Sequence, residues 1–220
     1  MDSLVAVAVG LGAAFLLVRG AHGQAVDLGV SLDQHRRPEV RSPVLIYGDS
    51  QVDGFGRGLA TALEDRGLSV TRAAHPGRGT QWLARNAPSV AGYASVIILS
   101  GSNDAHDNGY DADAPAAAAR LVQAVRQAGA SAIYVPALPL SDVTDFGRFR
   151  AVWGRSTDDP AYWFNRASGG FAANYDRVRR EIARAAQRQG ASILTLDRTT
   201  GSDGLHASRA DGARAAEALR

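Results

Sequence analysis

Downstream of residue 42, short apolar runs alternate with longer stretches in which apolar and polar residues follow a helical period. Residues 95–100 (SVIILS) are continuous, rich in β-branched residues and too short for a helix, so they predict a buried strand. Residues 115–128 begin with Pro and are followed by Gly129, which is typical of a helix. The same pattern predicts further strands over 44–47, 69–74, 132–135 and 192–196, and further helices over 57–66, 80–85, 175–189 and 209–219.

This alternation predicts an α/β fold in which helices cover both faces of a central, mostly parallel five-stranded sheet. In such sheets, sites gather at the carboxyl ends of the strands. Four polar or Gly-rich segments follow predicted strands directly or nearly so: 48–50, 75–80, 101–104 and 203–206. We therefore expect these segments to meet at one edge of the sheet.

The N-terminus has a different pattern. Residues 4–18 form an unbroken run of fifteen apolar residues and glycines, shorter than the ~20 residues of a comfortable membrane span. Asp2 precedes the run and Arg19 follows it, a charge order that suits an anchor better than a cleaved signal and that argues against export of the domain. We expect residues 1–20 to be a signal, an anchor or an arm that packs on a partner, residues 21–42 a linker, and residues 43–220 the folded domain.

Composition excludes several function classes. The chain has no Cys, which excludes disulfides, thiolate metal sites and a Cys nucleophile. Its formal net charge is +2, and its arginines are spread among acidic residues without a basic block, so we expect no nucleic-acid partner.

A candidate nucleophile follows the first strand of the domain. In Gly48-Asp49-Ser50, the strand-to-turn junction would project the Ser50 hydroxyl at the edge of the sheet, and the glycine gives room for a tight turn. These three residue types are also common in ordinary turns. The motif needs a base before it indicates catalysis.

A candidate base lies near the C-terminus. Of the five histidines, His22 and His35 precede the predicted domain, whereas His75, His106 and His206 follow strands. In Asp203-Gly204-Leu205-His206, the side chains of the first and last residues can point the same way. Asp203 can then hold the imidazole of His206, which accepts a proton from Ser50. The alternative is a surface turn that caps the last helix.

A serine that attacks a carbonyl group also needs donors for the oxyanion that forms. Asn103 follows the 95–100 strand and offers a side-chain N–H, and the Ser50 backbone offers another donor. A third donor is the backbone N–H of Gly77 or Gly79, where the absence of a side chain leaves room for substrate.

Together these motifs resemble the SGNH (GDSL-type) hydrolases. The family letters correspond to Ser50, Gly77 (or Gly79), Asn103 and His206, and the resemblance runs from about residue 44 to 220. It implies a flavodoxin-like three-layer sandwich and a serine esterase that hydrolyses esters or thioesters through an acyl-enzyme without a metal or cofactor. Gln51 stands where the narrow lipase-like GDSL pattern has Leu, which weakens a lipase assignment.

Other patterns have competing interpretations. Asp104, His106 and Asp107 resemble a metal cluster, but a hydrogen-bonded polar loop fits better because no further ligands are evident. The glycines of 54–58 hint at a phosphate loop, yet they match neither common phosphate-binding motif and fit the opening of a helix. The long aromatic stretch 137–170 is typical of a lid or binding loop.

The expected function is hydrolysis of small, acetyl-like acyl esters, for example on carbohydrate, by an exported or membrane-tethered enzyme. Two alternatives stay open. The same site can transfer the acyl group to a sugar, or the chain can be a structural or adhesive protein of a cell envelope or virus particle with a membrane or assembly contact through residues 4–18.

Overall fold

The computed structural model describes residues 7–10, 13–19, 25–27, 37–106, 109–139, 171–196, 199–200 and 206–220. The chain divides into two compact units, Met1–Arg37 and Pro38–Arg220.

The first unit contains a small antiparallel sheet within and after the apolar run. Strand β1 (Val7–Gly10) pairs with β2 (Ala13–Arg19), which in turn pairs with β3 (Ala25–Asp27). None of the helices in the described part of the chain is both long and apolar enough to cross a membrane.

The second unit begins five residues before the boundary that the sequence predicted. Val40 is buried, and its N–H donates to the carbonyl of Arg220 at 2.8 Å. The N–H of Arg220 donates to the Pro38 carbonyl at 2.9 Å. Because this segment pairs with the last residue of the chain, the end of the predicted linker is part of the folded domain.

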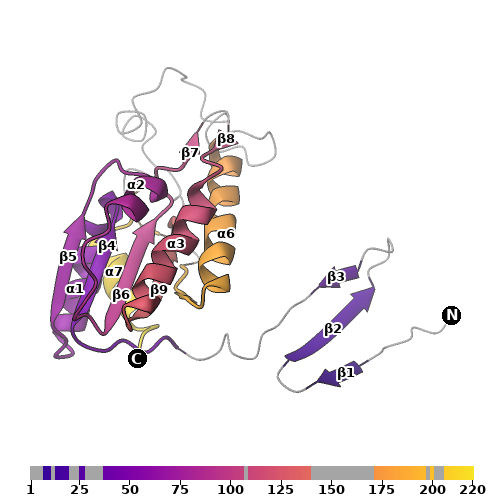
Figure 1. Cartoon of the computed structure of the whole chain (residues 1–220), viewed down its shortest axis with the longest axis horizontal. Helices are drawn as coiled ribbons and strands as arrows, with labels where there is room; N and C mark the ends of the chain where they lie inside the picture. The colour runs from indigo at the N-terminus through magenta and orange to yellow at the C-terminus, as the bar shows by residue number, and fades with distance from the viewer. Residues whose placement is uncertain are drawn as a thin grey trace. The chain divides into compact units, whose positions relative to one another are not determined.

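A five-stranded sheet forms the centre of this domain, and every pairing between its strands is parallel. Its order, β10-β9-β6-β4-β5, is the flavodoxin-like order 2-1-3-4-5. The predicted α/β fold is therefore confirmed (Figure 1). The strands are β4 (Val44–Gly48), β5 (Val70–Ala74), β6 (Ser95–Ser100), β9 (Ser131–Pro136) and β10 (Ser192–Ile193).

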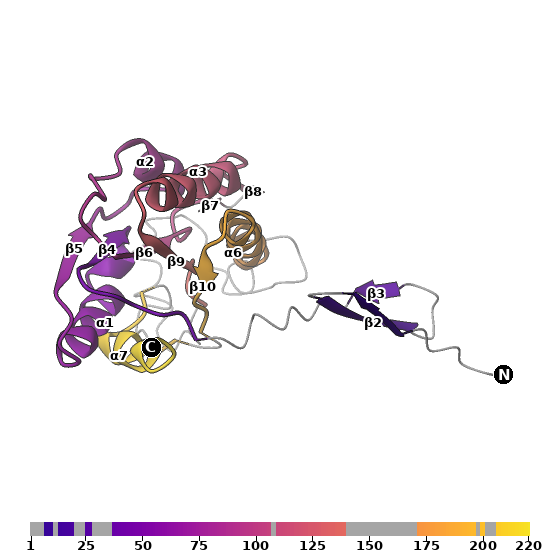
Figure 2. The same cartoon turned by 60° about the horizontal axis from the view of Figure 1, so that its bottom comes forward.

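Helices cover both faces of the sheet, as Figure 2 shows. One face carries α1 (Phe55–Glu64) and α7 (Arg209–Ala216). The other carries α2 (Thr80–Arg85), α3 (Ala114–Gln127) and α6 (Phe171–Arg188). A short antiparallel pair, β7 (Ala105–His106) with β8 (Gly109–Tyr110), follows β6.

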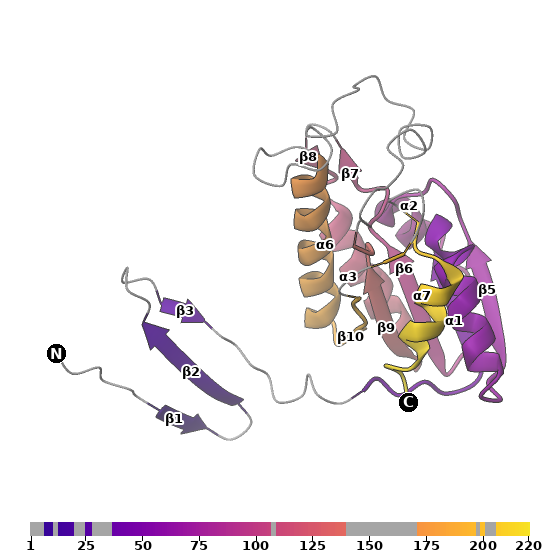
Figure 3. The ribbon, with the colours of Figure 1, turned by 180° about the vertical axis from the view of Figure 1, so that it is seen from behind.

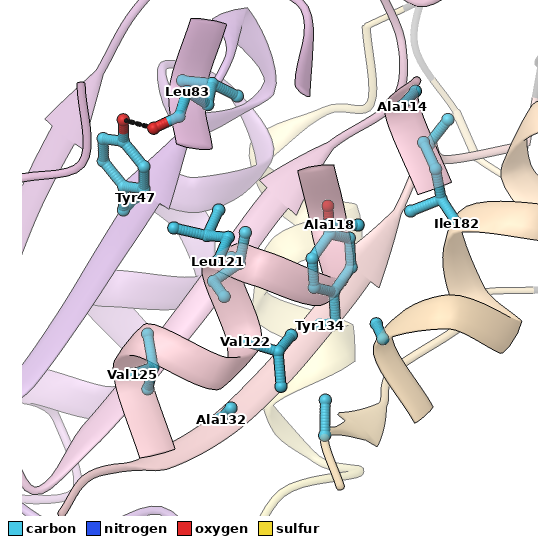
Figure 4. Packing of buried hydrophobic residues seen from close by; sticks show 14 of the residues in the cluster. Tyr47, Leu83, Ala114, Ala118, Leu121, Val122, Val125, Ala132, Tyr134 and Ile182 are labelled. Carbon is cyan, nitrogen blue, oxygen red and sulfur yellow. Dashed lines mark hydrogen bonds between the residues drawn. The ribbon is translucent and has the colours of Figure 1, made fainter. Parts of the chain in front are cut away.

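The core consists of two apolar layers separated by the sheet. Along β4, Leu45 and Tyr47 pack with the α3 and α6 side, whereas Val44 and Ile46 pack with the α1 and α7 side. Figure 4 shows the first layer, in which the Tyr47 hydroxyl donates to the Leu83 carbonyl at 2.8 Å. Strands buried on both faces explain why the runs in the sequence are continuously apolar rather than alternating.

Three predicted boundaries differ from the structure by three or four residues, and one of them is the end of α7, at Ala216 rather than at 219. Helix α6 begins at Phe171, four residues before the predicted start, because Phe171 is buried and its ring packs 5.7 Å from the ring of Tyr175. Strand β10 ends at Ile193 rather than at 196. Of the predicted lid, 137–139 are buried and 140–170 lie outside the described residues.

Helices α1 and α7 pack backbone against backbone, side by side in Figures 1 and 3. A Cβ on Gly58 would lie 1.9 Å from the Arg209 carbonyl oxygen, and one on Gly212 would lie 1.9 Å from that of Phe55. Helix α1 follows Ser50, and α7 follows His206. This close packing therefore holds together the two segments that carry the predicted nucleophile and base.

Candidate active site

Ser50 lies at the carboxyl edge of the sheet, in the 3-10 turn η2 (Ser50–Val52) directly after β4. Asp49 caps this turn, because its Oδ1 accepts from the Gln51 N–H at 2.9 Å while its own N–H donates to the Leu99 carbonyl at 3.1 Å. Glycine is required at position 48, where a Cβ would lie 1.9 Å from the same carbonyl oxygen. The junction between β4 and β6 therefore fixes where the Ser50 hydroxyl emerges.

The structure brings Ser50 and His206 together across 156 residues of chain. The distance from Ser50 Oγ to His206 Nε2 is 2.8 Å, and both residues are partly exposed. In the neutral imidazole with its proton on Nδ1, Nε2 accepts the hydroxyl proton, which is the geometry of a nucleophile and its general base. Asp203, the predicted orienting acid, lies outside the described residues.

A buried carboxylate holds both ends of the segment that carries His206. Asp211 Oδ2 accepts from the Thr200 N–H at 2.8 Å and from the Ser208 N–H at 2.9 Å, and Ser208 caps α7. Burial raises the pKa of Asp211, but the hydrogen bonds from Thr200 and Ser208 outweigh burial and lower the pKa below its usual value. Asp211 therefore ties Ser208, two residues after His206, to Thr200.

Asn103 follows β6 and lies against the loop after β5. Its Nδ2 donates to the Arg78 carbonyl at 3.3 Å, so the predicted segments 75–80 and 101–104 meet. A side-chain amide has two N–H donors, and this bond uses one of them. The second N–H of the Asn103 amide can donate a hydrogen bond to an oxyanion.

Gly77 and Gly79 are required for different reasons. Gly77 has φ +72° in a turn closed by the Arg78 N–H and the His75 carbonyl at 3.3 Å, with Pro76 before it, as in a type II turn. Gly79 is extended, and a Cβ there would lie 2.7 Å from Asp104 Oδ1. The Arg78 carbonyl, which accepts from Asn103, and the Gly79 N–H belong to the same trans peptide. The C=O and N–H of a trans peptide point in opposite directions, so the Gly79 N–H points away from Asn103.

Comparison with known proteins places this arrangement in a known fold. The domain is similar to a candidate lipolytic protein of the G-D-S-L family from Desulfitobacterium hafniense, with a TM-score of 0.55, 14% identity, and coverage of 80% of this chain and 95% of that one. It is also similar to the aryl esterase of M. smegmatis, with a TM-score of 0.52, 16% identity, and coverage of 80% and 95%. The chain has the SGNH hydrolase fold. No protein-family profile matches the sequence, and no curated protein does.

Two of the remaining candidates, Asp104 and the segment 54–58, have structural roles. Asp104 is buried and accepts from the Thr80 N–H at 2.9 Å and from the Thr80 hydroxyl at 2.6 Å. The side chain of His106 and Asp107 lie outside the described residues, and within the described ones no group of three metal-ligating side chains occurs. Gly54 caps the start of α1, which confirms that 54–58 opens a helix.

His75 belongs to an aromatic group. Its ring centroid lies 5.4 Å from that of Tyr47 and 5.1 Å from that of Trp82. The Arg78 guanidinium carbon lies 5.0 Å from the Trp82 ring centroid, in a cation–π contact. This group adjoins Asn103 through the backbone of Arg78.

Three polar residues beneath the site are buried, which the sequence motifs did not predict: Asp49, Gln51 and Ser102. Burial raises the pKa of Asp49 to about 7, an effect that the Gln51 N–H opposes and the nearby charge of Asp104 strengthens. The sequence signal for this burial is a cluster of polar residues directly after fully apolar strands. Buried polar residues form hydrogen bonds, so such a cluster can indicate a hydrogen-bonded network beneath a site.

Proposed function

We propose that the chain is a serine esterase that hydrolyses small, acetyl-like acyl esters, for example on carbohydrate, through an acyl-enzyme on Ser50. The observation that carries the proposal is the 2.8 Å contact between Ser50 Oγ and His206 Nε2 at the carboxyl edge of a parallel sheet. Sites in open α/β sheets lie at that edge. A surface turn that only caps α7 does not explain this contact, because Ser208 and Asp211 already cap that helix.

The reaction follows from the geometry in two steps. As Ser50 Oγ attacks the ester carbonyl carbon, His206 Nε2 takes the hydroxyl proton and then gives it to the departing alcohol, leaving the acyl group on Ser50. Water then attacks the acyl-enzyme, loses its proton to His206, and releases the carboxylic acid and free Ser50. In this proposal Asp203 accepts the Nδ1–H bond of His206 and stabilises the imidazolium.

The negative charge on the carbonyl oxygen needs donors fixed in advance. The proposed donors are the Ser50 N–H, the Gly77 N–H and the second N–H of the Asn103 amide. The direction of the Gly79 N–H, away from Asn103, supports Gly77 over Gly79 for this role.

The surface beside these donors suits a polar alcohol group. Arg78 is exposed and its guanidinium stacks on the partly exposed Trp82, next to the loop that bonds Asn103. An aromatic face with a cation beside it can contact both the apolar face and the hydroxyls of a sugar ring. This arrangement supports a carbohydrate ester over a long-chain lipid.

A series of p-nitrophenyl esters tests this substrate preference. We expect kcat/KM to be highest for the acetate and to fall with acyl length, with activity unchanged by EDTA and absent in Ser50→Ala. A preference for octanoate would contradict the small-acyl proposal, and loss of activity on chelation would contradict the metal-free mechanism.

We further propose that the apolar N-terminal unit exports the chain or tethers it to a membrane or an assembly. Apolar stretches such as residues 4–18 aggregate when they are left in water. We expect the full chain, but not a version that begins at Pro38, to sediment with membranes or as an assembly, or else N-terminal sequencing to find a mature end near Gln24. An uncleaved, monomeric full chain that stays in solution would contradict the proposal.

A further inference from the structure

We propose that Gln51 is a positioning residue that holds His206 in register with Ser50. The role as stated rests on the proposed esterase function, because His206 is the base of that reaction. Gln51 follows Ser50 directly in η2, and only 2% of its surface is exposed. A buried residue of this kind cannot contact substrate from the surface, so any effect on catalysis acts through its neighbours.

The amide of Gln51 bridges two other segments of the site. Its Oε1 accepts from the Ala207 N–H at 3.1 Å, and its Nε2 lies 3.4 Å from Ser102 Oγ. A backbone N–H can only donate, so the oxygen of the amide must face Ala207 and the nitrogen must face Ser102. Ala207 is the residue after His206, and Ser102 is the residue before Asn103.

This bridge restrains the backbone that aims the imidazole. Anchoring the Ala207 N–H fixes the peptide that joins His206 to Ala207, and therefore the direction in which the His206 side chain leaves the backbone. The next peptide, which joins Ala207 to Ser208, is closely packed, because a Cβ on Gly54 would lie 2.8 Å from the Ala207 carbonyl oxygen. On the far side, Ser208 and Asp211 hold the following residues.

Leucine, the residue of the narrow GDSL pattern, fills a similar volume but has no acceptor. In a Gln51→Leu variant the buried Ala207 N–H would lose its partner, and an unpaired buried donor costs about 1–3 kcal/mol. The segment is expected to shift to recover a hydrogen bond, and His206 with it. Displacing a catalytic group by ~1 Å can cost on the order of 100-fold in rate.

The test compares Gln51→Leu with Ser95→Ala in the full chain. Ser95 is a matched control because it is fully buried and also bridges two segments, accepting from the Arg41 N–H at 2.8 Å and lying 3.0 Å from Ser131 Oγ. It begins β6, so it lies at the opposite edge of the sheet from Ser50. A loss that only reflects lower stability would appear in both variants.

In Gln51→Leu we expect kcat to fall by about 10- to 100-fold while KM stays within about twofold, and in Ser95→Ala we expect both constants to stay near those of the wild type. A second readout needs no activity: the 15N spectrum of the histidine side chains, with the His206 signals identified by their loss in His206→Ala. The wild type should show the single tautomer that accepts at Nε2, and Gln51→Leu should show the mixture of a free imidazole.

The two readouts separate this proposal from the proposed function. If the wild type hydrolyses no ester but the His206 signals change in Gln51→Leu alone, the esterase proposal fails and the positioning role stands. His206 signals that are the same in Gln51→Leu and the wild type would overturn the positioning role, whatever the activity.

Discussion

Replacing Ser50 by Ala is expected to lower kcat for ester hydrolysis by on the order of 10⁴-fold or more, because the acyl-enzyme can no longer form. The measurement is the initial rate with p-nitrophenyl acetate, corrected for hydrolysis in buffer. Ser69→Ala is the control, since Ser69 is exposed and lies directly before β5, at the opposite edge of the sheet from Ser50. Its rate should match that of the wild type.

His206→Ala should cause a loss of similar size, and the double variant should lose little more. The members of such a site act as a unit, so their effects do not add. The 2.8 Å contact between the two side chains is the structural reason for this expectation. A double variant whose loss equals the product of the two single losses would show that Ser50 and His206 act independently.

Asn103→Ala is expected to lower kcat by about 10²- to 10³-fold, the usual effect of removing one oxyanion donor. Its unfolding midpoint should change little, because Asn103 is partly exposed and its bond to the Arg78 carbonyl is long, at 3.3 Å. Asn86→Ala is a matched control: its Nδ2 also donates to a backbone carbonyl, that of Trp82 at 2.9 Å, but at the end of α2. A near-normal kcat in Asn103→Ala would mean that the oxyanion is bound elsewhere.

The fold was largely predictable because its signals are local. Ser95–Ser100 forms a strand with the predicted bounds, since a short run of β-branched residues favours a strand whatever surrounds it. Pro115 and Gly129 likewise marked the ends of α3 to within two residues. Given alternating strands and helices, the handedness of the crossover connections leaves few sheet topologies, and the observed parallel order is one of them.

The hydrogen-bonding partners within the site were not predictable in the same way. The bond from Ala207 to Gln51 joins residues 156 positions apart, and nothing in the local pattern of either residue points to the other. Buried polar contacts depend on the direction of individual side chains, which the sheet topology does not determine. The capping box of Ser208 and Asp211 is the exception, because the spacing of a Ser and an acid three residues later is a recognisable sequence signal for a helix start.

A fluorophosphonate probe tests whether Ser50 is an activated nucleophile. Such a probe reacts covalently with serine hydroxyls that a neighbouring base has activated, and peptide mass spectrometry identifies the labelled residue. The expected result is a single label, on Ser50, that disappears in Ser50→Ala and forms much more slowly in His206→Ala. A wild-type chain that stays unlabelled, or that carries the label on another serine, would contradict it.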